Sequence, residues 1–137
     1  MNIKKYVTGR VLIVEDGPGN QRVVSHFLKK SGFEFDQAPN GQIACDKILK
    51  EGERYDCILM DMQMPVLDGY GAVTLLRENN YAGPIIALTA HAMKEDRQKC
   101  IDIGCDDYTA KPIKKKKLIA IVSKYVEESK RTEKVCE

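Results

Sequence analysis

The sequence has no long apolar run and no segment that resembles a targeting signal. A membrane-spanning helix needs about 20 apolar residues in succession, and no stretch of this chain approaches that length. The first ten residues carry basic side chains, but the apolar stretch that a signal peptide needs does not follow them. These absences predict a cytoplasmic protein whose folded part makes no membrane contact.

Cysteine pairs with metal-ligand spacing are also missing. The chain has five cysteines, an odd number, and no Cys-x-x-Cys motif. This pattern argues against a disulfide framework and against a zinc site, and it predicts reduced, structural thiols.

An excess of charge of either sign is absent as well. Lys plus Arg number 22 and Asp plus Glu number 20, so the net charge is only +2. That balance gives no support for direct nucleic-acid binding. The 137 residues, of which 43% are hydrophobic, suit one globular domain that buries its core without disulfides or a structural metal.

Short apolar runs mark the expected strands. Residues 11–14, 58–60 and 85–88 are continuously apolar, which is typical of strands buried on both faces of a parallel sheet. Residues 34–38 form a more polar candidate that suits a sheet edge, and residues 107–110 form a weaker fifth candidate.

Helical patterns lie between the strands. We expect helices over about 20–31, from an Asn40 cap to about 50, from an Asp68 cap to about 79, over about 94–103, and through Leu118–Tyr125. From about Glu128 the chain is polar, and we expect it to fray. The expected division is an N-terminal extension at 1–9, a domain at 10–127 and a polar tail at 128–137.

Strand and helix thus alternate five times along the chain. This order predicts a doubly wound, flavodoxin-like (βα)5 fold of the α/β class, with a parallel sheet covered by helices on both faces. The common strand order for such a sheet is 2-1-3-4-5, which makes the first and third strands neighbours.

Acidic residues follow those two strands. Glu15 and Asp16 come directly after the first strand, and Asp61 comes directly after the third. Ligands of open α/β sheets bind at the carboxyl ends of the strands where the strand order reverses, so the three carboxylates are expected to converge there. Gathered carboxylates repel one another, and a hard cation such as Mg²⁺ relieves that repulsion.

Two further polar residues end at the same edge of the sheet. Thr89 follows the fourth strand and Lys111 follows the fifth. A hydroxyl and an ammonium beside a metal-bound carboxylate can hold phosphate oxygens. An Asp nucleophile with these partners is sufficient for phosphoryl transfer, which depends mainly on positioning and charge neutralisation.

The combined pattern resembles the receiver domain of response regulators over about residues 10–126, and its phrasing is similar to receivers attached to hybrid histidine kinases. The matching pieces are VLIVED at 11–16, MDMQMPVLDG at 60–69, ALTAHA at 87–92 and KP at 111–112. The resemblance implies a two-component phosphorelay protein that promotes its own phosphorylation and dephosphorylation and does not turn over an external substrate. The phosphodonor would be a histidine kinase or a histidine phosphotransfer protein.

The resemblance also implies residue roles. Asp61 would accept the phosphoryl group, while Thr89 and Lys111 would contact its oxygens. Mg²⁺ would be held by Glu15, Asp16, Asp61 and the backbone carbonyl of Gln63. Tyr108 would occupy the position of the switch aromatic, which Thr89 controls, and the Lys111–Pro112 bond would be cis. The surface that switches would be the fourth helix, fifth strand and fifth helix, and Gln63 and His91 would tune dephosphorylation.

Other interpretations stay open at this stage. A haloacid-dehalogenase phosphatase also uses Asp and Mg²⁺, but it needs a second acid where Gln63 stands. A flavodoxin-like cofactor carrier needs a phosphate loop where Glu15 and Asp16 stand. The Lys114–Lys117 run is either a solvated helix start or a docking surface for an acidic partner. The chain is either a stand-alone regulator or the receiver of a hybrid kinase, which could be membrane-anchored.

Overall fold

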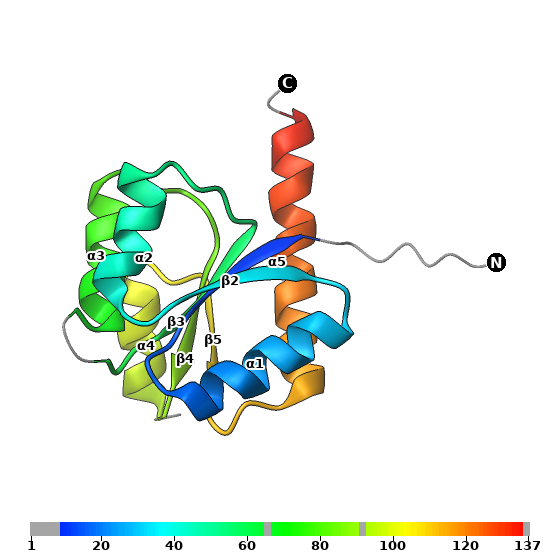
Figure 1. The fold of residues 1–137 in the computed structure, drawn as a ribbon. Helices are drawn as coiled ribbons and strands as arrows, with labels where there is room; N and C mark the ends of the chain where they lie inside the picture. The colour runs from blue at the N-terminus through cyan, green and yellow to red at the C-terminus, as the bar shows by residue number, and fades with distance from the viewer. Residues whose placement is uncertain (1–8, 65–66, 91–92, 136–137) are drawn as a thin grey trace.

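The computed structural model describes residues 9–64, 67–90 and 93–135. Within them, five parallel strands form one sheet: β1 (Arg10–Val14), β2 (Glu34–Ala38), β3 (Cys57–Asp61), β4 (Ile85–Thr89) and β5 (Asp107–Ala110). Their order is β2-β1-β3-β4-β5, and helices cover both faces of the sheet (Figure 1). The predicted doubly wound α/β topology is therefore confirmed.

The helices follow the strands in turn. They are α1 (Pro18–Lys30), α2 (Gly41–Cys45) with the π-helical turn η1 (Asp46–Lys50), α3 (Gly69–Glu78), α4 (Lys94–Ile103) and α5 (Lys115–Val135). The side chains of Asn40 and Asp68 accept hydrogen bonds from the N–H groups of Ile43 and Gly71, at 2.9 and 2.8 Å. Both predicted helix caps are thus confirmed.

Two helices differ from expectation. The second is not one uninterrupted α-helix to about residue 50, because its last five residues form the π turn η1. The last is longer than expected: α5 runs to Val135, so the backbone is helical where we expected fraying from Glu128. The Ser129 hydroxyl donates to Asp56 Oδ1 at 3.2 Å, which ties this part of α5 to the residue just before β3.

The core has one layer on each side of the sheet. Buried side chains of α1 and α5, among them Leu28 and Val122, pack with Ile13 and Leu59 of the strands. Side chains of α2, α3 and α4 pack on the opposite face. Cysteines in the described part of the chain are buried with free thiols, as predicted, and these are Cys45, Cys57, Cys100 and Cys105.

Candidate functional site

Three carboxylates meet at the carboxyl edge of the sheet. Glu15 follows β1 and Asp61 ends β3, and these strands are parallel neighbours with Val14 opposite Met60. One oxygen from each of Glu15, Asp16 and Asp61 lies within 4.8 Å of the others. Glu15 and Asp61 are only 1% and 2% exposed, whereas Asp16 is open to solvent. The structure therefore brings together the three acids that the sequence singled out.

Lys111 projects into the same cluster. Its Nζ lies 3.2 Å from Asp61 Oδ1 and 3.3 Å from Glu15 Oε1. The Lys111 N–H donates to the Thr89 carbonyl at 2.8 Å, which joins the ends of β4 and β5, and the Lys111–Pro112 bond is cis as predicted. Thr89 is buried at this edge. The Lys111 ammonium thus lies within the acidic cluster, and Thr89 ends the strand next to β3.

Glu15 has the most perturbed environment in the cluster. Burial raises the pKa of Glu15 and the neighbouring Asp61 raises it further, while the Gly17 N–H and Lys111 oppose the rise. Glu15 Oε2 accepts from the Gly17 N–H at 3.1 Å. Oε1 is buried and accepts no hydrogen bond, although the Lys111 ammonium lies 3.3 Å away. A buried, unsatisfied carboxylate oxygen in an all-oxygen donor set fits a hard cation such as Mg²⁺.

The backbone after β3 orients the Asp61 carboxylate. The Gln63 N–H donates to Asp61 Oδ1 at 3.0 Å, and the Gln63 side chain is exposed. Gly69, at the start of α3, packs directly on this segment: a Cβ there would lie 2.6 Å from the Met62 Cα and would also overlap the Asp61 carbonyl. Sequence reasoning gave Gly69 no role of its own, and its position just after the Asp68 cap was the available signal.

Tyr108 lies next to this edge on β5. It is partly buried and packs against the core, and the Arg97 guanidinium carbon lies 5.1 Å from the centre of its ring. His91, the other residue expected to tune dephosphorylation, lies outside the described residues. The expected roles of Tyr108, Gln63 and His91 stay predictions.

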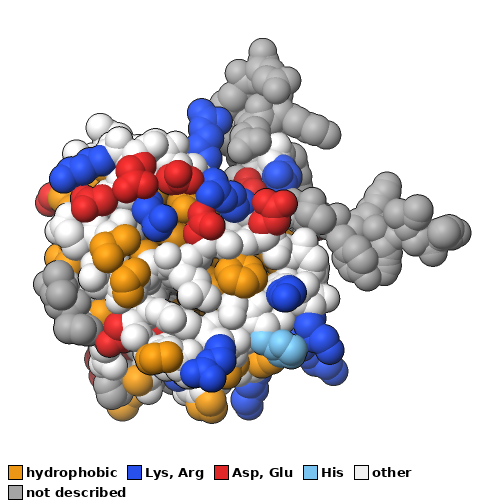
Figure 2. Space-filling view, viewed as in Figure 1, with side chains coloured by type: hydrophobic (Ala, Val, Ile, Leu, Met, Phe, Trp, Pro, Cys, Tyr) orange, Lys and Arg blue, Asp and Glu red, His pale blue; other side chains and the backbone are white. Residues whose placement is uncertain are grey.

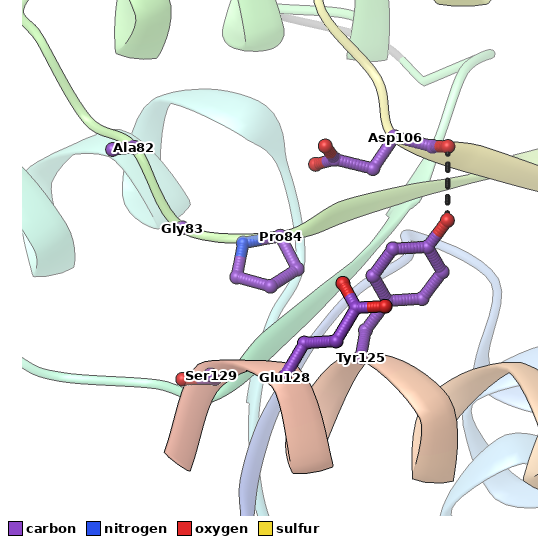
Figure 3. Close-up of a pocket in the computed structure, with 7 residues that line it drawn as sticks. All are labelled: Ala82, Gly83, Pro84, Asp106, Tyr125, Glu128 and Ser129. Atoms are coloured by element: carbon purple, nitrogen blue, oxygen red, sulfur yellow. Dashed lines mark hydrogen bonds between the residues drawn. The ribbon is translucent and has the colours of Figure 1, made fainter. Parts of the chain in front are cut away.

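A groove of about 350 Å³ lies at the opposite edge of the sheet. Pro84 directly precedes β4 and Asp106 directly precedes β5, so the groove is at the amino ends of the strands (Figure 3), whereas Asp61 lies at the carboxyl end of β3. Tyr125 spans it, with its hydroxyl donating to the Asp106 carbonyl at 3.1 Å. No predicted site residue lines this groove among the residues described, so it is not the candidate site.

The fold and this site define a class of protein: an open α/β sheet with carboxylates, a hydroxyl and a lysine at its switch point. The model of the response regulator receiver domain matches residues 11–123. The chain therefore belongs to the receiver domain family of two-component systems.

Relatives of two kinds match the chain. Hybrid signal transduction histidine kinase I of Dictyostelium discoideum is 41% identical over 139 residues, which cover 93% of this chain and 8% of the kinase. The two-component response regulator ORR41 of Oryza sativa subsp. japonica is 38% identical over 85% of this chain and 93% of its own length. The chain thus spans less than a tenth of the length of the hybrid kinase and nearly all of the single regulator.

A solved structure repeats the fold. The receiver domain of the sensor histidine kinase PA1611 from Pseudomonas aeruginosa, with magnesium coordinated in its active-site cleft, has a TM-score of 0.78 and 41% identity, covering 88% of this chain and 98% of that one.

In the described residues of our chain, no helix has the length and apolar character needed to cross a bilayer.

Proposed function

We propose that Asp61 is the phosphoacceptor of this receiver domain. One observation carries the proposal: Lys111 Nζ lies 3.2 Å from Asp61 Oδ1 inside a cluster that also holds Glu15 and Asp16. A buried carboxylate paired with a lysine at a strand end is placed to act as a nucleophile toward an incoming phosphoryl group.

The proposed reaction moves one phosphoryl group from nitrogen to oxygen. An Asp61 carboxylate oxygen attacks the phosphorus of a phosphohistidine, a P–O bond forms, the P–N bond breaks, and the leaving imidazole takes up a proton. The Lys111 ammonium and the Thr89 hydroxyl hold the phosphoryl oxygens, which lowers the barrier by neutralising their charge. The acyl phosphate is later hydrolysed by water, and Gln63 and His91 would tune that rate.

Glu15, Asp16, Asp61 and the Gln63 backbone carbonyl are the proposed Mg²⁺ ligands. The unsatisfied Glu15 oxygen and the exposed Asp16 support this assignment. Bound Mg²⁺ would neutralise charge on the carboxylates and on the transferring phosphoryl group. The fold would hold the three carboxylates around the position of the ion, next to the Lys111 ammonium.

Phosphorylation would act on the α4-β5-α5 surface. The added negative charge would draw the Thr89 hydroxyl toward Asp61, and Tyr108 would move into the space that Thr89 leaves. The partial burial of Tyr108, on the strand next to the one that carries Thr89, supports this proposal. The result is a two-state equilibrium that one local charge biases.

The proposed donor is a histidine kinase or a histidine phosphotransfer protein, and the proposed compartment is the cytoplasm. A solved complex of the yeast phosphotransfer protein Ypd1 with the receiver domain of Ssk1 has a TM-score of 0.81 and 30% identity to this chain, covering 89% of it and 91% of that chain. A receiver of the same fold in complex with a histidine phosphotransfer protein supports a protein of that kind as the donor. The chain would act either as a single-domain regulator or as the receiver of a hybrid kinase.

The test is labelling with acetyl phosphate and Mg²⁺, followed by intact-mass measurement. We expect the wild type to gain one phosphoryl group, and Asp61→Asn and a chelator each to abolish the gain. Asp102→Asn, an exposed acid on α4, is the matched control and should label normally. Labelling that persists in Asp61→Asn would refute the assignment.

A further inference from the structure

Helices α1 and α5 lie on the same face of the sheet and share one core layer (Figure 1). Neither α1 nor α5 as far as Val126 contains an Asp or a Glu. We call their exposed surface, together with Lys114 just before α5, the basic face. Its members are Arg22, His26, Lys29, Lys30, Lys114, Lys115, Lys116, Lys117 and Lys124. Eight Lys and Arg side chains thus gather on one layer of a chain whose net charge is only +2.

The side chains of the basic face point outward. Arg22, His26 and Lys30 are spaced four residues apart on α1, so they form one exposed stripe along the helix. Figure 2 shows Lys and Arg side chains around a histidine over α1, at the lower right, with no acidic side chain among them. In the described part of the chain, the cations of α1 and of 114–117 form no ion pair.

The basic face adjoins the phosphorylation site. Helix α1 begins two residues after Asp16, and Lys114 lies three residues after Lys111. A protein that brings a phosphohistidine to Asp61 must therefore cover the edge of this face. Lysines in the first turn of α5 also oppose the helix dipole, which is a cost to the isolated domain that a bound acidic partner would remove.

Apolar side chains lie next to basic ones on this face. Val23 is 42% exposed on α1, one turn from His26, and Phe27 and Ile113 are only partly buried in the same layer. Exposed apolar side chains beside charged ones are usual in protein–protein interfaces. This favours a protein partner over a lipid surface or a nucleic acid.

We infer that the basic face docks an acidic surface of the protein that donates the phosphoryl group to Asp61. The inference rests on the proposed function and adds the chemistry by which the donor is selected. Opposite charge steers the donor to the site, raises the association rate and disfavours donors with neutral or basic surfaces. The attraction weakens as salt screens it.

Two synthetic peptides of equal length test this inference, and each carries one phosphohistidine. Glutamates flank the phosphohistidine in one peptide, and serines flank it in the other. At low salt, we expect the wild type to take the phosphoryl group about tenfold faster from the glutamate peptide. Raising the salt should shrink that preference. R22E/K29E/K116E/K117E should abolish it, and K50E/R54E/K94E/K99E, which changes the charge equally on the other side of the sheet and in a loop, should keep it.

The outcomes separate the two proposals. Labelling of Asp61 by acetyl phosphate reports the proposed function without any docking, and its absence would remove that function and this inference together. With acetyl phosphate labelling intact, a wild type without preference, or an equal loss in both charge variants, overturns the inference alone. Absence of a peptide preference together with face-dependent binding to phosphatidylserine vesicles would assign the face to lipid instead.

Discussion

Lys111 places an ammonium between two buried carboxylates, 3.2 Å from Asp61 and 3.3 Å from Glu15. Without Lys111, no ammonium at this position would stabilise the negative charge that develops on the phosphoryl oxygens. We expect Lys111→Ala to slow labelling by acetyl phosphate at saturating Mg²⁺ by about 10²-fold, as for other lost oxyanion donors. Lys50→Ala, an exposed lysine of η1, is the control. Equal initial rates for Lys111→Ala and the wild type would contradict this role.

Asp36 shows a residue-scale effect away from the site. The Tyr55 hydroxyl donates to its carboxylate at 2.8 Å, and this bond, with the nearby Arg10, lowers the pKa of Asp36 below its ordinary 3.8. A carboxyl whose pKa is lower in the folded state stabilises the fold above its unfolded pKa. That contribution is lost as the pH falls through the folded value.

The prediction concerns the free energy of unfolding in urea, compared between the wild type and Asp36→Asn. At neutral pH the wild type should be more stable by up to about 1 kcal/mol, because the pair is partly exposed. The difference should shrink as the pH falls below about 5 and through the folded pKa of Asp36. A difference that stays constant over this range would show that the ionised Asp36 contributes nothing.

Two glycines near helix starts differ in the space around them: the chain packs closely against Gly69 and leaves Gly19 open. A Cβ at Gly69 would lie 2.6 Å from the Met62 Cα, whereas a Cβ at Gly19 would have no neighbour within 4 Å. We expect Gly69→Ala to destabilise the fold by about 1–3 kcal/mol through overpacking, and to displace Asp61. Gly19→Ala should leave stability unchanged or slightly raised. Chemical denaturation measures both, and similar values for the two would contradict the packing argument.

Among the elements, the sequence predicted the strands and helices whose bounds follow from a local pattern of apolar residues. Strands β2 and β5 and helix α4 have the predicted bounds. Strands β1 and β4 are one residue longer at one end, and β3 is one residue longer at each end. The π turn η1 and the length of α5 were missed. Helix α5 makes a tertiary contact beyond Glu128, the bond from Ser129 to Asp56, which no local period reveals. Nothing in the sequence pattern marked the π turn.

The site was predictable for the same reason that the sheet was. Once β1 and β3 are neighbours, residues that follow them must meet, so the positions of Glu15, Asp16 and Asp61 followed from strand order. The requirement for glycine at position 69 could not be predicted in this way, because it arises from the close packing of α3 against the chain after β3. Outside the site, the structural role of Arg77 was also not predicted. It donates hydrogen bonds to the carbonyls of Tyr81, Gly83 and Gly104, which come together only when the chain folds.

For the whole molecule, metal binding and folding should be coupled. A ligand that binds only the folded state stabilises it, by about 2.7 kcal/mol at a hundred times its Kd. We therefore expect Mg²⁺ to raise the melting temperature of the wild type and a chelator to reverse the rise. The rise should be smaller in Asp16→Asn and preserved in Asp102→Asn. An identical rise in all variants would place the binding elsewhere.

The central claim is that one buried carboxylate, Asp61, receives the phosphoryl group. The most direct measurement is reductive trapping. Borohydride converts an aspartyl phosphate to homoserine, and peptide sequencing by mass spectrometry then locates the altered residue. After labelling with acetyl phosphate and Mg²⁺, we expect homoserine at position 61 and at no other acid of the cluster. Homoserine at position 16, or no trapped product from labelled protein, would contradict it.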